Sequence, residues 1–214
     1  MIYTMVVLSI FLFLAGGVAD AEDLQAIKLL TPALENDKPF MQVAKERKSD
    51  RDFSKKELSL QDLSNILWCA NGINRPDTGN RTVPSPMNKQ DIDVYAVLKE
   101  GVYLYEAKSH ELIPVASGDY RKDVGMQSYV AIAPLNLIYV CDLAKLDFLK
   151  NPEDQAMTAG IDAGHCSQNV YLYCAAANIG AVIRTSIDRA KISSVFGLQQ
   201  EQMVVAGQTV GYLK

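Results

Sequence analysis

The segment from Arg47 to Phe53 carries the residues best suited to binding a negatively charged group. It reads R-K-S-D-R-D-F, so three cations and a hydroxyl fall within five positions, at Arg47, Lys48, Ser49 and Arg51. The planar guanidinium of arginine offers a fork of N–H donors that matches a phosphate, and serine adds a compact hydroxyl. The pattern therefore predicts a phosphate site next to the end of a short helix. The competing interpretation is a solvated helix end of mixed charge.

Further blocks of sequence follow that could serve the same site. The chain contains W-C-A-N-G-I-N-R-P from Trp68, R-T-V-P-S-P-M-N from Arg81, and D-A-G-H-C-S-Q-N-V-Y-L-Y-C-A-A-A from Asp162, and it closes on V-G-Y at Tyr212. In this order the blocks resemble the FMN-dependent nitroreductase superfamily, and most closely its short branch of thiazoline and oxazoline oxidase-type dehydrogenases. The resemblance runs from about Phe40 to Tyr212. It rests on the order of the blocks, because no single block is specific.

The resemblance implies FMN as the cofactor and assigns its phosphate end. Arg47, Ser49 and Arg51 would take the phosphate and the ribityl chain, with Lys48 as a weaker candidate. Many members of the family carry a basic residue past the G-Y pair that reaches the phosphate. In this chain only Lys214 could serve in that way.

The resemblance also assigns a loop to the flavin ring, which Pro84, Ser85, Met87 and Asn88 would line. The family commonly has small residues between its Ser and Asn, whereas this chain has Pro86 and Met87. Proline has no N–H, so any family contact through that amide is lost here, and Met87 adds bulk that narrows the substrate face. Without the other blocks, a plain proline-rich loop would be the better interpretation.

Two further pairs of residues match the family. Arg184 and Thr185 lie in the region that supplies a backbone donor to the reactive nitrogen of the flavin, so the resemblance implies that role for them. Gln168 and Asn169 match the family's Q-N pair. On a buried helix these amides must be hydrogen-bonded, and a purely structural role is at least as well supported for them.

The resemblance implies an oxidoreductase that acts as a homodimer with two flavin sites at its interface. A reduced donor, NAD(P)H among the candidates, would give a hydride or electron pair to FMN, and an organic small-molecule acceptor would then take it. The cofactor carries this chemistry, so we expect no catalytic acid or base from the protein. Two alternatives stay open. One is an FMN-dependent dehydrogenase or oxidase with oxygen or quinone as acceptor, and the other is a flavin-less binding protein on the same scaffold.

The composition excludes several other classes of protein. The net charge of −4 and the pI of about 5.2 give no basic surface for nucleic acid. The four cysteines form no C-x-x-C pair and have no metal-ligand spacing, so no metal site is expected. Cys166 and Cys174 share one expected helix about 12 Å apart along its axis, too far for a disulfide. We expect most of the thiols to be free and buried.

The N-terminus has the pattern of a secretory signal. An apolar run from Met5 to Ala15 is followed by a small-x-small cleavage pattern at 19–21, which predicts a signal peptide over residues 1–21, an exposed lead-in over 22–38 and one domain over 39–214. We therefore expect an exported, periplasmic protein with no membrane anchor once the signal is removed. An uncleaved anchor is the rival. Export conflicts with a nicotinamide donor, which is scarce outside the cytoplasm.

Periodicity predicts the elements that would position these residues. We expect helices from Pro39 toward Arg47, from the Ser59 cap to Gly72, over 153–178 and from the Asp188 cap to Gly197. We expect strands over 91–98, 102–105, 111–116, 135–141, 181–185 and 202–212, and an irregular loop over 73–88. The order of elements favours an α+β domain with a mainly antiparallel sheet surrounded by helices. The resemblance specifies the nitroreductase fold.

Overall fold

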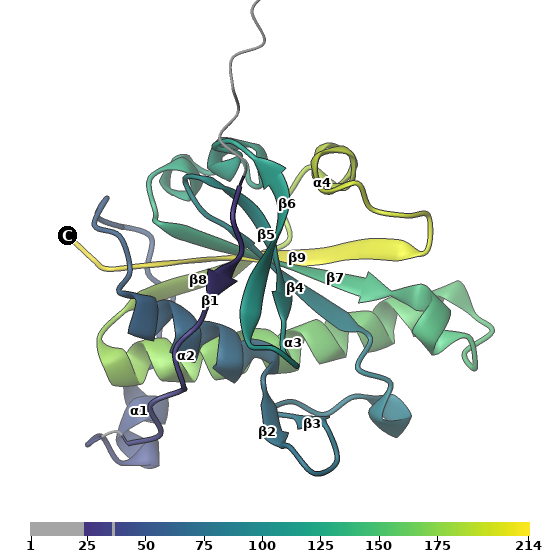
Figure 1. The fold of residues 1–214 in the computed structure, drawn as a ribbon, viewed down its shortest axis with the longest axis horizontal. Helices are drawn as coiled ribbons and strands as arrows, with labels where there is room; N and C mark the ends of the chain where they lie inside the picture. Colours follow the sequence, from purple (N-terminus) through teal and green to yellow (C-terminus); the bar gives the residue numbers. More distant parts are fainter. Residues whose placement is uncertain (1–23, 36) are drawn as a thin grey trace, which may run out of the picture.

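The computed structural model describes residues 24–35 and 37–214, which form one seven-stranded sheet with helices on both faces (Figure 1). The strand order is β1-β6-β5-β4-β7-β9-β8, and every neighbouring pair is antiparallel. The strands are β1 (Ile27–Lys28), β4 (Ile92–Val97), β5 (Gly101–Glu106), β6 (Glu111–Ser117), β7 (Leu135–Asp142), β8 (Gly180–Arg184) and β9 (Gln202–Gly211). The expected α+β class with a mainly antiparallel sheet is confirmed.

The helices form the outer layers of the domain. The α-helices are α1 (Phe40–Glu46), α2 (Leu60–Asn71), α3 (Pro152–Ala177) and α4 (Arg189–Phe196). Short 3-10 turns follow at η1 (Pro86–Asn88), η2 (Arg121–Asp123), η3 (Ser128–Ala131) and η4 (Leu143–Leu146). Residues of α2 and α3 pack on one face of the sheet, and residues of α4 pack on the other (Figure 1). The long helix and the capped last helix lie where the sequence predicts them.

The hydrophobic core lies on both faces of the sheet, with β7 at its centre. All residues of β7 from Leu135 to Cys141 are buried, as its continuous apolar run predicts. Successive side chains of a strand point to opposite faces. Leu137 and Tyr139 accordingly pack on the α2 and α3 side, while Ile138 and Val140 pack on the α4 side.

The N-terminus of α2 is fixed by the predicted capping pattern. The Ser59 hydroxyl oxygen accepts from the Asp62 N–H at 3.0 Å and donates to Asp62 Oδ2 at 2.6 Å. The same carboxylate accepts from the hydroxyls of Tyr173 at 2.8 Å and Tyr212 at 2.6 Å. These bonds tie the start of α2 to α3 and to the end of the chain, and α2 ends at Gly72 as expected.

The long helix α3 buries only one side of its surface. Residues at helical spacing, among them Ala163, Cys166, Val170 and Cys174, are buried against the sheet. The apolar sequence of 170–177 predicts a helix buried on all sides, but this is wrong, since residues 172, 173 and 175–177 are only half-buried. A helix lying on a sheet covers it with one side, and the described chain places nothing over much of the other side.

Two expectations about irregular segments need revision. The 73–88 loop contains a small hairpin of β2 (Ile73–Arg75) and β3 (Asn80–Arg81), followed by η1, so the expectation of no regular element there is wrong. The hairpin was missed because its strands are too short to show a period of two. The expected exposed lead-in of 22–38 includes edge strand β1, paired with β6, and the core residue Leu29, which is 5% exposed.

The expected signal peptide over residues 1–21 lies outside the described residues. Among the helices that the structure describes, none is both long and apolar enough to cross a membrane. All four cysteines are free thiols, and Cys141, Cys166 and Cys174 are buried, as the sequence predicts. Cys69 is half-buried, and burial raises the pKa of its thiol to about 12.

Candidate functional site

The motif from Arg47 to Phe53 extends the sheet beyond β8. After α1 the chain runs alongside the free edge of β8, where the Asp50 N–H donates to the Ala181 carbonyl at 3.0 Å. Phe53 forms an isolated bridge with Leu213, and its ring is 1% exposed. The Lys214 N–H donates to the Asp52 carbonyl at 3.2 Å. The opening motif, the outer edge of β8 and the end of the chain are therefore held together.

Tyr171 of α3 organises the polar side chains of this motif. The Ile183 N–H of β8 donates to the Tyr171 hydroxyl oxygen at 2.8 Å, and the Ser49 hydroxyl lies 2.9 Å from the same oxygen. Either hydroxyl can be the donor in the Ser49–Tyr171 bond. When Tyr171 donates, the Ser49 proton is free for another acceptor. The Arg47 guanidinium lies over the Tyr171 ring, 5.1 Å from its centroid.

The charges of this cluster are only partly compensated. Lys48 Nζ lies 3.4 Å from Asp50, and Lys214 Nζ lies 2.6 Å from Asp52. Arg47 and Arg51 form no ion pair with any described residue, and the Arg51 Nη1 reaches only the Ser49 carbonyl at 3.5 Å. The structure therefore brings Arg47, Ser49 and Arg51 together as donors without a carboxylate partner. Such a set suits an anion better than a solvated helix end.

The second predicted group lies in a strained loop, residues 84–90. Met87, Asn88 and Gln90 have φ angles of 48°, 56° and 50°, in the left-handed region that residues with a side chain seldom adopt. Each such residue costs on the order of 1 kcal/mol, and strain of this kind is concentrated at functional sites. The side chains of Met87 and Asn88 are exposed, with Met87 68% exposed. The loop thus presents these side chains outward.

Gln90 holds the loop in this conformation. Its N–H donates to the Ser85 hydroxyl at 2.8 Å, and its amide nitrogen donates to the Gly79 carbonyl at 3.1 Å. Its side-chain oxygen accepts from the Arg81 guanidinium at 2.9 Å, and its carbonyl accepts from Lys145 Nζ at 3.0 Å. The Ser85 hydroxyl is therefore committed as an acceptor within the loop. Pro84 is exposed beside it.

Arg184 has a structural side chain. The residue is 6% exposed, and its guanidinium donates to Thr209 Oγ1 at 2.6 Å, to the Val124 carbonyl at 3.0 Å and to Asn136 Oδ1 at 3.2 Å. Burial without a carboxylate lowers the pKa of Arg184 to about 10. Of this predicted pair, Thr185 is the exposed member. By the alternation of a strand, its N–H points to the same free edge as the Ile183 N–H.

The Q-N pair of α3 divides between two roles. Asn169 donates to the Cys69 carbonyl at 3.1 Å and to the Thr82 carbonyl at 3.3 Å, so it ties the end of α2 and the approach to the 84–90 loop to α3. Gln168 is exposed on the other side of the helix. The structural interpretation of this pair is thus supported for Asn169.

The two predicted groups do not meet within one chain. The 47–51 cluster lies at β8, whereas the 84–90 loop leads directly into β4. β4 and β8 are separated by β7 and β9, so three strand spacings of about 4.8 Å put them about 14 Å apart. The described chain therefore does not bring the two predicted groups into one site.

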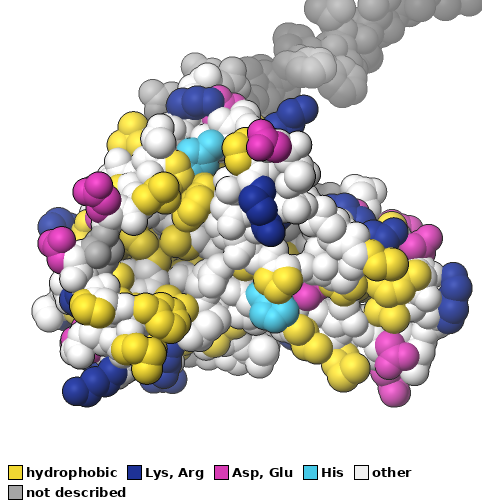
Figure 2. Space-filling view, turned by 90° about the horizontal axis from the view of Figure 1, so that it is seen from below, with side chains coloured by type: hydrophobic (Ala, Val, Ile, Leu, Met, Phe, Trp, Pro, Cys, Tyr) yellow, Lys and Arg dark blue, Asp and Glu magenta, His cyan; other side chains and the backbone are white. Residues whose placement is uncertain are grey.

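The outer face of α3 is open and apolar. A Cβ added at Gly160 or Gly164 would meet nothing within 4 Å, and Met157 and Ile161 on this helix are 62% and 52% exposed. Figure 2 shows hydrophobic side chains recurring across this side of the molecule, with most charged side chains toward its rim. Gly160 and Gly164 therefore lie at the surface, uncovered by the described chain, whereas Ala159 and Ala163 face the core.

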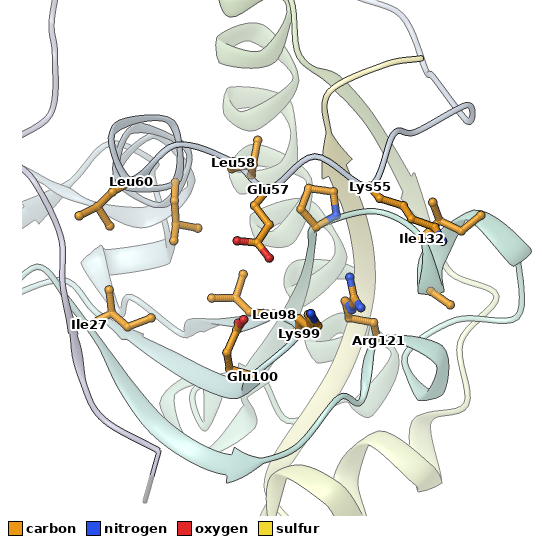
Figure 3. Close-up of a pocket in the computed structure, with 13 residues that line it drawn as sticks. Ile27, Lys55, Glu57, Leu58, Leu60, Leu98, Lys99, Glu100, Arg121 and Ile132 are labelled. Atoms are coloured by element: carbon orange, nitrogen blue, oxygen red, sulfur yellow. The ribbon is translucent and has the colours of Figure 1, made fainter. Parts of the chain in front are cut away.

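A cavity of about 570 Å³ lies elsewhere, between the start of α2, the β4–β5 turn and the η2–η3 segment (Figure 3). Glu57 and Glu100 point into it from opposite sides (Figure 3). None of the predicted site residues lines it. Its walls are formed by Ile27, Lys55, Glu57, Leu58, Leu60, Leu63, Leu98, Lys99, Glu100, Arg121, Ala131, Ile132 and Pro134.

Comparison with known proteins agrees with this fold. Residues 44–212 match the model of the nitroreductase family. A crystal structure of a Ralstonia eutropha protein named as a nitroreductase is 34% identical, covers 92% of each chain and has a TM-score of 0.84. A Methanocaldococcus jannaschii protein named as a nitroreductase is 27% identical over 146 residues, which are 64% of this chain and 73% of that protein. A Staphylococcus epidermidis structure named as an NAD(P)H:FMN oxidoreductase is 14% identical, covers 84% of this chain and 89% of that one, and has a TM-score of 0.60.

The antiparallel sheet with its edge motif at β8 defines an α+β domain of the nitroreductase fold. The chain belongs to the nitroreductase family, a family of oxidoreductases, as the resemblance implies.

Sequence reasoning missed three residues that shape the two groups. Tyr171 lies two positions after the Q-N pair, and its place on the buried side of α3 was a signal that could have found it. Gln90 had no such signal, because glutamine is not typical of left-handed backbone. The burial of Asp162 at the start of the D-A-G-H block is a third feature that composition does not indicate.

Proposed function

We propose that this protein is an FMN-dependent oxidoreductase that passes a hydride or electron pair from a reduced donor to an organic acceptor. The observation that carries the proposal is the grouping of Arg47, Ser49 and Arg51 on Tyr171, with two guanidinium groups that no described carboxylate neutralises. A phosphate monoester fits such a set of donors. The printed name of the Staphylococcus epidermidis neighbour, an NAD(P)H:FMN oxidoreductase, supports flavin and a nicotinamide donor.

The chain's own residues bind and orient the cofactor in this proposal. Arg47, Ser49 and Arg51 would hold the phosphate, and Lys214 adds a cation next to them. The free edge of β8 at Thr185 offers a backbone N–H toward the ring. When bound, FMN supplies the acceptance and release of the electron pair in two half-reactions. The side chain of Arg184 is hydrogen-bonded inside the core, so Arg184 contributes to the site only by holding the backbone of the next residue in place.

The two half-sites support a homodimer in which each flavin is bound by both chains. In one chain the 47–51 cluster lies outside β8 and the 84–90 loop leads into β4, three strands away, so a second copy brings in the missing half most simply. The open face of α3, with Gly160 and Gly164, allows another helix to approach closely. An exposed apolar face of this kind is typical of an interaction surface.

Mixing two inactive variants tests this arrangement. We expect Arg51→Ala and Asn88→Ala each to lose most FMN binding while remaining dimers by light scattering. In a mixed dimer, one site combines both defects and the other is intact. Refolding equal amounts together should therefore restore FMN to about a quarter of all sites, since about half of the dimers are mixed.

The contrary outcomes are distinct. If the mixture does not recover FMN binding, then either one chain supplies both groups to the same flavin or the protein does not form the proposed dimer. Absence of flavin binding by the unmodified protein would leave the flavin-less binding protein as the better interpretation. Activity with oxygen or a quinone as the sole acceptor would favour the dehydrogenase alternative.

A further inference from the structure

Two carboxyl side chains are buried next to each other beneath the 84–90 loop. Asp91 directly follows the loop and is fully buried, and Asp162 of α3 is 4% exposed. Together with Ser85 they line a cavity of about 10 Å³, too small for more than one water molecule. Asp91 Oδ1 and Asp162 Oδ2 have no hydrogen-bond partner among the described residues. Two ionised carboxylates left in this state would be strongly unfavourable.

Among the described residues, only His165 lies within ion-pairing distance of either carboxylate, with Nδ1 3.6 Å from Asp162 Oδ1, and it is half-exposed. Cys141 Sγ donates to Asp91 Oδ2 at 3.3 Å. Arg81, which lines the same cavity, and Lys145 keep their charges while they donate to Gln90, but neither forms an ion pair with Asp91 or Asp162. The charged and titratable groups around the pair are Arg81 on β3, Asp93 on β4, Cys141 and Asp142 on β7, Lys145 on η4, and His165 and Cys166 on α3.

A single proton resolves this arrangement. A protonated carboxyl donates a hydrogen bond to its ionised neighbour, and that bond satisfies the two oxygens without a partner. Burial, followed by the charge of Asp91 and the hydrogen bond to it, raises the pKa of Asp162 to about 7. The proton is therefore retained below about pH 7 and is half lost at pH 7.

The pair is linked to the loop through one peptide bond. Gln90, whose left-handed backbone and four hydrogen bonds fix the loop, precedes Asp91 in the chain. Repulsion between the two carboxylates is relieved most easily by moving Asp91, because Asp162 is held in the middle of the long helix α3. Moving Asp91 displaces Gln90 and releases the Ser85 hydroxyl from its N–H.

We infer that Asp91 and Asp162 are positioning residues that share one proton and lock the 84–90 loop, and that loss of this proton releases the loop. The assignment of the loop to the flavin ring rests on the proposed function. The lock itself concerns only the residues described above.

Hydrogen exchange of the apo-protein tests the lock without any flavin. Mass spectrometry would measure the exchange rate of peptides that cover residues 79–91. At each pH, the rate in the wild type is divided by the rate in Asp162→Asn. This ratio cancels the chemical dependence of exchange on pH. We expect this ratio to rise at least about tenfold between about pH 5 and pH 7 and to level off above pH 7, because the ionised fraction of a group with a pKa of about 7 grows tenfold per pH unit below that value and saturates above it. A ratio that stays near one throughout would overturn the inference.

Two further variants keep the result decisive. Asp91→Asn removes the other carboxylate of the pair. The ratio of the wild-type exchange rate to the rate of this variant must therefore rise over the same pH range. This variant keeps the test valid if Asp162→Asn does not fold. Asp93→Asn is the matched control, since burial also raises the pKa of this β4 carboxyl but it lies outside the pair. If the ratio of the wild-type exchange rate to that of Asp93→Asn rises as much with pH, the effect comes from titration of buried acids in general, and the inference is overturned.

Titration with FMN separates this inference from the proposed function. We expect the wild type to lose FMN affinity between about pH 5 and pH 7 relative to Asp162→Asn. Loop release without FMN binding at any pH would support the lock and contradict the proposed function. FMN binding without any pH-dependent change in loop exchange would support the proposed function and contradict the lock.

Discussion

Replacing Arg51 by alanine tests whether the cluster at β8 binds a phosphate. Arg51 is exposed and its one described contact is to the Ser49 carbonyl at 3.5 Å, so its loss should hardly affect folding. Bound to a phosphate, its guanidinium would make at least one charge-assisted hydrogen bond. Such a bond contributes about 1.5–3 kcal/mol, so we expect Arg51→Ala to weaken FMN binding roughly ten- to hundred-fold.

Riboflavin provides the internal control, because it has the same ring and ribityl chain without the phosphate. Apo-protein of wild type and Arg51→Ala would be titrated with both ligands, and only FMN affinity should fall. Lys56→Ala is the matched variant, since Lys56 Nζ lies 4.4 Å from the Tyr212 ring and outside the cluster. Equal losses for both ligands, or unchanged FMN affinity, would refute the phosphate assignment and favour the solvated helix end.

Three other predictions concern the buried acid, the buried arginine and the N-terminus. The pKa of Asp162 in the folded protein, about 7, lies above its value in the unfolded chain, so the folded protein binds one more proton between these values. As the pH rises from about 4 to about 7, the free energy of unfolding of the wild type should therefore fall by up to about 4 kcal/mol. Urea unfolding of Asp162→Asn should lack this slope, and an identical slope would contradict the assignment. Gly125→Ala places a Cβ 2.5 Å from Arg184 Nε, so thermal melts should show a loss of about 1–3 kcal/mol, and an unchanged melt would contradict this packing. Intact mass of protein from the native host should lack residues 1–21, and a full-length mass would argue against export.

The fold could be predicted in most of its elements, because its signals are local. The Ser59 cap, the β-rich segment from Ile92 to Val97 and the apolar run at Leu135 each determine one element from nearby residues. The β2–β3 hairpin and the edge strand β1 escaped prediction since two or three residues cannot display a period. Their places depend on partners distant in the sequence, such as β6 for β1.

The site could be predicted only as a set of residues. R-x-S-x-R indicates a phosphate group, and the structure places Arg47, Ser49 and Arg51 together. The burial of the Arg184 guanidinium could not be read from the sequence, because it depends on acceptors from β7, β9 and the segment before η3. The proximity of Asp91 and Asp162 could not be predicted either, because these residues are 71 positions apart and meet only through the packing of α3 on the sheet.

The central claim is that the protein binds FMN, and absorbance of the purified protein tests it most directly. Protein isolated without added cofactor, and apo-protein incubated with FMN and then desalted, would be examined for the flavin band in the blue and near-ultraviolet. The extracted cofactor would be identified by mass. The account predicts a yellow protein that retains one FMN per chain. A colourless protein in both preparations, folded as judged by circular dichroism, would contradict it.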